Sequence, residues 1–148
     1  MWISLIVKKI FLNPKVLGEE EFFHQRYRLP IERYGDIASL KDLGAPFGYA
    51  SSKLSLNFYS KLLANRVAEY NVKVNNIVPG NIYFKSGNWD KKIKKNSKKI
   101  KKMINNKVPL RRFGKPEEIA DLTTFLLSSK SGFITGSEIV IDGGQIIK

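Results

Sequence analysis

Tyr49 and Lys53 are the residues of this sequence whose types and spacing could do chemistry. They stand four residues apart, so on a helix their side chains share one face. An ammonium group beside a phenol favours the phenolate and lowers the tyrosine pKa below its free value of about 10. A tyrosine with a lowered pKa can exchange protons near neutral pH. The pair therefore predicts an acid/base centre.

A helix and a strand are expected to position this pair. The helix runs from about Tyr49 to Tyr70, and its apolar stripe consists of Leu54, Phe58, Leu62 and Leu63. Residues 72–78 are rich in Val and Ile and predict a strand, which Pro79-Gly80 ends. The loop before the helix contains Gly and Pro, which favours a turn there.

The remaining elements predict an α/β layered domain. The lysine-rich run 91–106 has Ile93, Ile100 and Ile104 at near-heptad spacing, which indicates one helix with a thin apolar stripe. Pro116 begins another helix, which runs to about Ser128, and 138–142 is a short strand. This order of elements favours a parallel sheet. Before residue 35 we expect a single short strand, at 2–7.

Composition excludes several classes of site. The chain has 148 residues and 43% hydrophobic residues, enough for one packed domain. It has no Cys, so it has no disulfide or thiol nucleophile, and its one His, His24, has no partner for a metal site. No stretch is apolar for the ~18 residues that a membrane helix needs, and the apolar start has no secretory pattern. We therefore expect a cytoplasmic protein without a metal.

Five signatures occur in order along the chain, and together they resemble the C-terminal half of the short-chain dehydrogenase/reductase family. A lone Tyr-x-x-x-Lys would be weak evidence, but an ordered set at sensible spacing is specific. The resemblance extends from about Ile37 to Gln145. The signatures are Tyr49 with Lys53, residues 74–80 (VNNIVPG), residues 112–120 (RFGKPEEIA), residues 134–136 (ITG) and residues 142–144 (DGG).

The resemblance implies a Rossmann-like fold, a doubly wound parallel sheet, here lacking the N-terminal dinucleotide-binding strands. It also implies hydride transfer between a nicotinamide coenzyme, NAD or NADP, and a small carbonyl or alcohol substrate. Tyr49 would be the general acid/base, and Lys53 would lower its pKa and bind the nicotinamide ribose. Pro79 and Gly80 would lie beside the nicotinamide, with the backbone of Ile82 contacting its carboxamide.

The resemblance also implies roles for the segments around these residues. Residues 81–108 would form the substrate lid. The last strand and the glycines after it would support contacts in a homo-oligomer. Within the family, the chain is most similar to bacterial members described as 3-oxoacyl-carrier-protein reductases, and the choice between NAD and NADP cannot be read from it.

The chain departs from the family pattern before Ile37. The glycine-rich turn that holds the pyrophosphate is absent, and residues 29–35 contain a Pro and two charges in place of the expected apolar strand. The family's catalytic Ser lies thirteen residues before the Tyr, and that position here is Asp36. We therefore expect residues 1–35 to be an irregular segment and 37–148 to be the family domain, in a truncated or frame-disrupted chain.

Two residues are candidates to replace that Ser. Ser39 stands three residues late and would need a rearranged loop. Asp36 accepts hydrogen bonds, but when ionised it cannot donate one to a carbonyl oxygen, and its charge opposes formation of the Tyr49 phenolate. We interpret Asp36 as a loop residue without a catalytic role.

Two other functions stay open. The first is a non-catalytic oligomerisation fragment. The second is nucleic-acid binding through Lys91–Lys107, which holds nine lysines and much of the net charge of +13. For this run we favour a solvated helix face over nucleic-acid binding. Tyr83 and Trp89 either line a substrate pocket or pack the lid onto the body.

Overall fold

A parallel sheet forms the centre of the molecule. The structure is a computed structural model that describes residues 31–148. Within this range the sheet has the strand order β1 (Ile31–Tyr34), β2 (Val74–Pro79) and β3 (Glu138–Ile141), with every neighbouring pair parallel. Central β2 is buried from Val74 to Val78, as expected for a parallel strand covered on both faces.

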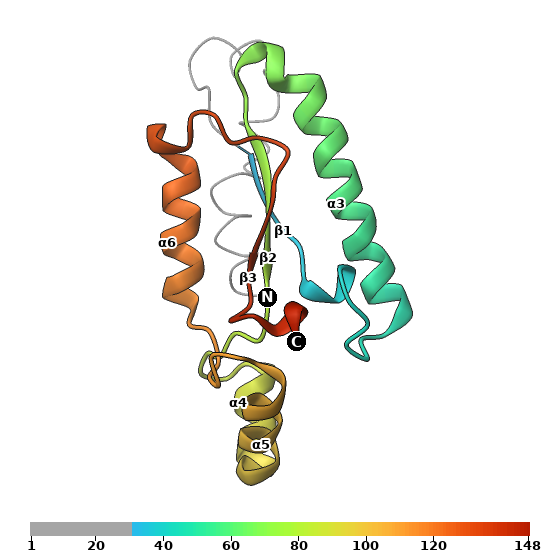
Figure 1. Cartoon of the computed structure of the whole chain (residues 1–148), viewed down its shortest axis with the longest axis vertical. Helices are drawn as coiled ribbons and strands as arrows, with labels where there is room; N and C mark the ends of the chain where they lie inside the picture. The colour runs from blue at the N-terminus through green and yellow to red at the C-terminus, as the bar shows by residue number, and fades with distance from the viewer. Residues whose placement is uncertain (1–30) are drawn as a thin grey trace.

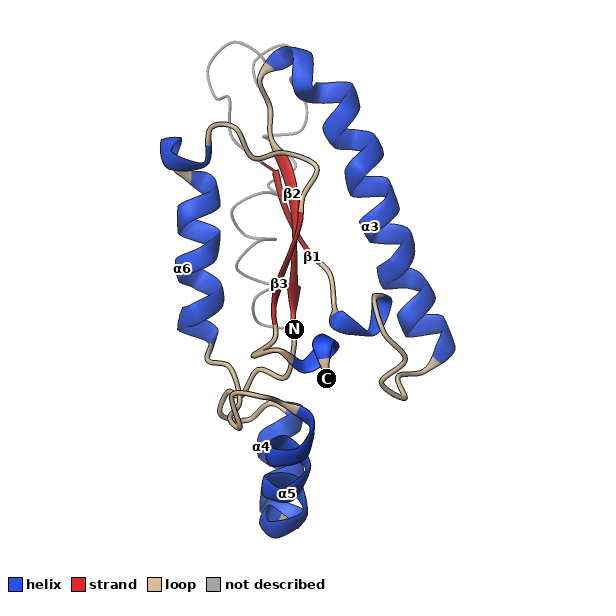
Figure 2. Cartoon of the chain, viewed as in Figure 1, coloured by secondary structure: helices blue, strands red, loops and turns tan. Residues whose placement is uncertain are grey.

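Two long helices cover the sheet from opposite sides. Helix α3 (Phe47–Val67) joins β1 to β2, and α6 (Pro116–Leu127) lies between β2 and β3 in the sequence. Figure 1 shows them flanking the sheet, and Figure 2 shows the same layers by element type. Parallel neighbours need such crossover connections. The expected α/β class with a partial Rossmann-like sheet is confirmed.

Two short helices replace the single helix that we predicted for residues 91–106. Helix α4 (Asn88–Lys95) and helix α5 (Ser97–Lys107) are separated at Asn96, whose backbone leaves the helical region at φ −157° and ψ 83°. The side chain of Asn96 accepts a hydrogen bond from the backbone N–H of Lys99 at 2.9 Å. An Asn favours this capping geometry over a helix interior, which explains the break. The pair projects beyond the carboxyl ends of the strands (Figure 1).

The apolar core lies on the α6 side of the sheet. Ile77 of β2 and Ile119 and Leu126 of α6 are buried together, and several half-buried residues pack around them: Ile82, Leu122, Ile134, Ile139 and Ile141. Burial of this apolar set is the main favourable term in folding.

Helix α3 turns a polar and small face to the sheet. Its buried residues are Asn57, Ser60 and Ala64. Our predicted apolar stripe is therefore wrong as a core face, because Leu54 is 57% exposed and Phe58 is 64% exposed. Hydrogen bonds from Asn57 to its neighbours, described below, hold this side of the helix against the sheet.

The strand that we expected to be absent before residue 36 is present. Residues Ile31–Tyr34 form β1, and the register pairs Ile31 with Val74 and Tyr34 with Ile77. Charged residues are compatible with this position because β1 is an edge strand of the described sheet. The strand predicted at 2–7, His24 and the rest of 1–30 lie outside the described residues.

The other predicted elements are confirmed with small shifts at their ends. The helix expected from Tyr49 begins at Phe47 and continues as the short 3-10 helix η2 (Ala68–Tyr70). Three more 3-10 turns complete the described chain: η1 (Ile37–Ser39), η3 (Ser129–Ser131) and η4 (Gln145–Ile147). Within residues 31–148 no helix combines the length and the apolar character needed to cross a bilayer.

Candidate active site

Tyr49 and Lys53 lie at the end of α3 that faces the carboxyl ends of the strands. The chain leaves β1, passes through η1, and enters α3, which runs back along the sheet toward the start of β2 (Figure 1). The first turn of α3 therefore shares one end of the molecule with Pro79 and Gly80, which follow the last buried residue of β2. In open α/β sheets, ligands bind at this end.

Asp36 is the direct partner of the Tyr49 hydroxyl. The hydroxyl donates to Oδ2 of Asp36 at 2.8 Å. The other carboxylate oxygen, Oδ1, accepts from the backbone N–H of Ala38 at 2.8 Å and caps η1. Our interpretation of Asp36 as a loop residue without a catalytic role stays a prediction. The structure adds that its carboxylate contacts the predicted proton-exchanging group.

The surroundings of Tyr49 raise its pKa above the ordinary value for a tyrosine. Partial burial is the largest cause, followed by the hydrogen bond to Asp36 and the Coulomb repulsion between its carboxylate and a phenolate. Our prediction of a lowered pKa is wrong for this arrangement. The Lys53 ammonium lies 5.8 Å from the centre of the Tyr49 ring, a cation–π distance.

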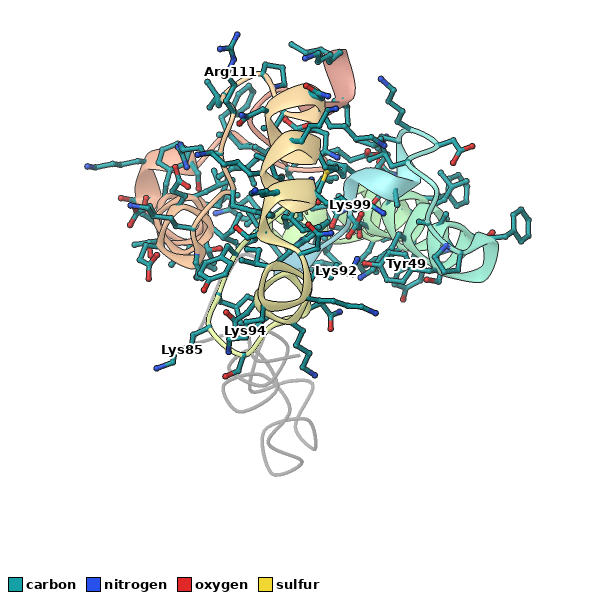
Figure 3. The ribbon with its side chains drawn as sticks, turned by 90° about the horizontal axis from the view of Figure 1, so that it is seen from below. Tyr49, Lys85, Lys92, Lys94, Lys99 and Arg111 are labelled. Carbon is teal, nitrogen blue, oxygen red and sulfur yellow. The ribbon has the colours of Figure 1, made fainter. Side chains whose placement is uncertain are left out.

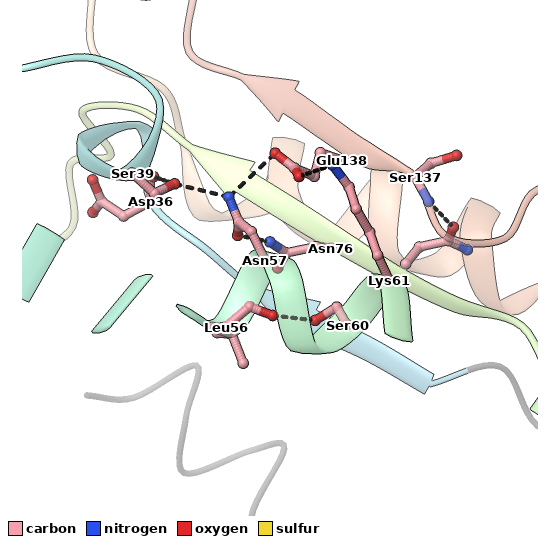
Figure 4. A network of polar contacts seen from close by, with 10 residues as sticks. Asp36, Ser39, Leu56, Asn57, Ser60, Lys61, Asn76, Ser137 and Glu138 are labelled. Atoms are coloured by element: carbon pink, nitrogen blue, oxygen red, sulfur yellow. Dashed lines mark hydrogen bonds and ion pairs between the residues drawn. The ribbon is translucent and has the colours of Figure 1, made fainter. Parts of the chain in front are cut away.

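Ser39 does not replace the missing serine. Its hydroxyl donates to the backbone carbonyl of Asp36 at 2.7 Å and accepts from Nδ2 of Asn57 at 2.9 Å. Because of these two contacts, the Ser39 hydroxyl points toward the interface between α3 and the sheet (Figure 4). The structure therefore does not show the rearranged loop that would bring Ser39 to Tyr49.

A polar network ties the site loop to the sheet. Asn57 bonds Ser39, donates to Glu138 at 3.2 Å and accepts from Nδ2 of Asn76 (Figure 4). Glu138 in turn pairs with Lys61 at 2.6 Å. Asn76 is 1% exposed, and the structure gives its Oδ1 no partner. Because these contacts join β2, β3 and α3, they fix the position of the loop that carries Asp36.

After β2 ends, residues 81–83 pair with Gly114 and leave the backbone of Ile82 turned outward. Tyr83 N–H donates to Gly114 C=O at 2.9 Å, and Gly114 N–H donates to Asn81 C=O at 3.0 Å. These two bonds make an isolated parallel bridge between Ile82 and Gly114. In such a bridge the N–H and C=O of Ile82 itself point away from Gly114. A carboxamide carries one donor group and one acceptor, so it complements such a backbone pair. A cavity of about 90 Å³ adjoins this loop and is lined in part by Ile82 and Asp142.

Gly80 is required at this exit because of a close approach. A Cβ atom on Gly80 would lie 2.7 Å from Cα of Asp142, closer than such atoms come in real proteins. The N–H of Gly80 donates to the carbonyl of Ile141 at 3.0 Å. The glycine therefore allows β2 and β3 to leave the sheet side by side.

The base of the predicted lid is held by Asp90, a residue that our sequence analysis did not single out. Asp90 is buried and accepts from the Tyr83 hydroxyl, the Ser86 N–H and the Lys94 ammonium at 2.9–3.0 Å. These contacts lower its pKa, with the bond from Lys94 as the largest cause. In the sequence, the only sign of this role is that Asp90 stands four residues before Lys94, a spacing that favours an ion pair on a helix.

The aromatic residues of the lid pack onto the body. The Trp89 and Tyr83 rings lie 5.3 Å and 6.1 Å from the ring of Phe113. Of the two alternatives for these residues, this geometry supports packing.

Arg112, next to Phe113, forms a two-point ion pair with Glu118 at 2.6 and 2.8 Å and lowers the pKa of that carboxyl to about 2. The pair secures the start of α6, where Glu118 also bonds the N–H of Lys115.

A comparison against known protein families matches most of the described chain. A family model described as enoyl-(acyl carrier protein) reductase matches residues 37–145. The chain belongs to the short-chain dehydrogenase/reductase family. The matched range coincides with the extent of the resemblance predicted from the signatures, from about Ile37 to Gln145.

Individual members of the short-chain dehydrogenase/reductase family match most of this chain. The 3-oxoacyl-(acyl-carrier-protein) reductase FabG of Thermotoga maritima is 34% identical over 122 residues, which are 78% of this chain and 47% of that protein. The NAD-dependent glycerol dehydrogenase of Listeria innocua is 32% identical over 148 residues, which are 99% of this chain and 55% of that protein. The chain thus spans about half the length of these curated relatives.

A solved structure of the same family has a similar fold. L-sorbose reductase from Gluconobacter frateurii, complexed with NADPH and L-sorbose, superposes with a TM-score of 0.74 at 29% identity. The match covers 81% of this chain and 48% of that protein. Members of the family are dehydrogenases and reductases that use NAD or NADP. The described residues fit the nicotinamide end of such a coenzyme through the backbone of Ile82.

Proposed function

We propose that this chain carries the proton-exchange part of an NAD(P)-dependent oxidoreductase acting on a small carbonyl or alcohol. The observation that supports it is that the first turns of α3, which carry Tyr49 and Lys53, and the exit of β2 lie at the same carboxyl end of one parallel sheet. This is the end at which α/β proteins bind nucleotides. The coenzyme, when bound, supplies or accepts the hydride.

Each residue of the chain has a distinct role in this proposal. Tyr49 exchanges a proton with the oxygen of the substrate. Lys53, one turn further along α3, contributes positive charge near the Tyr49 ring and reaches the ribose of the coenzyme. Pro79 and Gly80 border the nicotinamide, and the N–H and C=O of Ile82 bond its carboxamide. The choice between NAD and NADP stays open.

Coenzyme titration tests this function. NADH and NADPH are added separately to the full chain, and their fluorescence reports binding. Turnover is followed as oxidation of the reduced coenzymes by a panel of small carbonyl compounds and as reduction of NAD and NADP by the matching alcohols. We expect saturable binding of at least one coenzyme and measurable turnover. Binding of neither coenzyme contradicts the proposal and favours the non-catalytic oligomerisation fragment, the alternative left open by the sequence.

We also propose that the protein is a homo-oligomer. The support is the face of α3 that points away from the sheet, where Phe47, Leu54, Phe58 and Leu62 are all exposed. Contiguous apolar side chains of this kind mark interaction surfaces. Sedimentation velocity is expected to show a species larger than the 16.9 kDa monomer, and Phe58→Ser is expected to shift it toward the monomer. A wild-type chain that sediments only as a monomer contradicts this assembly.

The lysines of α4 and α5 are proposed to be a solvated face of the lid. All nine lysines between Lys91 and Lys107 are exposed. Seen from the carboxyl end of the sheet, Lys92 and Lys99 lie on the side of the helix pair that is nearer Tyr49, and Lys94 lies on the other side (Figure 3). Trp89, the aromatic residue of α4 and α5, is half-buried and packs on Phe113, which disfavours its use for base stacking with single-stranded nucleic acid. A cytoplasmic location stays a prediction.

A further inference from the structure

The carboxylate of Asp36 is held rigidly against the Tyr49 hydroxyl. Asp36 follows Gly35 in the chain, and the N–H of Gly35 donates to the carbonyl of Ile77 at 2.7 Å. A Cβ atom on Gly35 would come within 2.9 Å of Asn76 and 3.0 Å of Asn57, so the backbone fits tightly against the sheet network. One carboxylate oxygen caps η1 and the other meets Tyr49. The direction of both carboxylate oxygens is thereby determined by their surroundings.

The chemistry of this contact fixes the direction of its hydrogen bond. An ionised carboxylate has no proton, so the Tyr49 hydroxyl must donate to Asp36. The hydroxyl has one proton, and that proton is now committed. A ligand at the hydroxyl therefore meets only lone pairs, which lie on the Tyr49 oxygen and on the Asp36 carboxylate. The pair therefore accepts hydrogen bonds and offers none.

We infer that Asp36 is a specificity-determining residue that makes this site accept hydrogen bonds, so that the group bound at Tyr49 is an alcohol hydroxyl and not a carbonyl oxygen. An alcohol brings its own proton and can donate it to this pair. A carbonyl oxygen is only an acceptor and would face two acceptors. The inference rests on the proposed function for the location of the substrate, and it adds the class of substrate.

The charges near Tyr49 favour a neutral donor over a cationic one. The Lys53 ammonium lies 5.8 Å from the centre of the Tyr49 ring. Its positive charge opposes the approach of a second cation to Tyr49. Tyr49 is 43% exposed, so water competes for these lone pairs. We therefore expect a modest preference, with a matched ketone bound about 5- to 20-fold more weakly than its alcohol.

The substitution Asp36→Asn inverts the polarity of this contact with almost no change of shape. The amide oxygen of Asn keeps the cap on η1, since Asn is as good a capping residue as Asp. The amide nitrogen takes the place of Oδ2 and donates to the Tyr49 oxygen, which releases the tyrosine proton for a ligand. The matched control is Asp42→Asn, which makes the same charge change in the same loop, where Asp42 accepts from the N–H of Gly44 at 2.9 Å.

The first measurement is the titration of Tyr49, followed by NMR of tyrosine labelled at the ring carbon that bears the hydroxyl. The Tyr49 resonance is assigned by its loss in Tyr49→Phe. We expect Asp36→Asn to lower the Tyr49 pKa by about one pH unit or more, because a charge and an accepted hydrogen bond are both removed. We expect Asp42→Asn to leave the Tyr49 pKa unchanged. An unchanged pKa in Asp36→Asn overturns the inference.

The second measurement compares cyclohexanol with cyclohexanone, two probes of nearly equal shape, by their effect on the same resonance. The wild-type chain is expected to bind the alcohol more tightly, and Asp36→Asn is expected to reverse the order. A wild-type preference for the ketone, an unreversed order in the variant, or no effect of either probe overturns the inference. Neither measurement needs a coenzyme or turnover, so failure of the proposed oxidoreductase function would be seen separately in the coenzyme titration.

Discussion

Replacing Tyr49 by Phe is expected to lower the turnover of the proposed oxidoreductase by about 10²- to 10⁴-fold, the usual contribution of a positioned acid/base. The substitution removes one oxygen atom and keeps the ring over which Lys53 lies. It also removes the hydroxyl that donates to Asp36. Coenzyme binding should change little, because the backbone around Ile82 is untouched. The measurement is the steady-state rate of coenzyme oxidation or reduction at a saturating concentration of the carbonyl or alcohol substrate.

The control for this experiment is Tyr59→Phe on the same helix. Tyr59 is 53% exposed and lies ten residues beyond Tyr49, away from the carboxyl end of the sheet. The turnover of the Tyr59→Phe variant is expected to equal that of the wild-type chain. Equal turnover in all three proteins would show that the chemistry does not pass through Tyr49.

Replacing Ile77 by Ala is expected to lower the free energy of unfolding by about 2–5 kcal/mol, a large share of the stability of a small domain. Ile77 has no exposed surface and packs against Ile119 and Leu126 in the apolar core. Removing its three terminal carbons loses buried apolar contact and leaves a cavity between β2 and α6. Urea unfolding followed by circular dichroism measures the change.

Phe133→Ala is the matched control for the core substitution. Phe133 is a larger side chain than Ile77 but is fully exposed, at 105% of the reference area. Its removal is expected to change the free energy of unfolding by no more than about 0.5 kcal/mol. Similar losses for Ile77→Ala and Phe133→Ala would mean that the apolar core does not lie between β2 and α6.

The patterns that depend on near neighbours in the chain were predictable. The helix that carries Tyr49, the strand before Pro79 and the helix that begins at Pro116 all follow from periodicity, punctuation and capping. The isoleucine spacing continues across the break at Asn96 and so predicts one helix, although Asn followed by Ser is a capping signal. The edge strand β1 was missed because its charges were judged as if it were a buried strand.

The character of the site depended on contacts between distant parts of the chain. Counting thirteen residues back from Tyr49 identified Asp36, but the count could not show that its carboxylate accepts the Tyr49 proton. The apolar residues of α3 were assigned to the core, yet the helix buries Asn57 because Ser39, Asn76 and Glu138 supply its partners. Each partner comes from a different element.

Residue types and local spacing are enough to identify the family, the α/β layers and the helical face shared by Tyr49 and Lys53. The charge that acts on Tyr49 is set by contacts between distant parts of the chain. Spacing along a helix suggested that Lys53 would lower the pKa of the phenol, whereas burial and the carboxylate brought in by the loop after β1 raise it. A pKa responds to every nearby charge and to exclusion of water, and folding sets both.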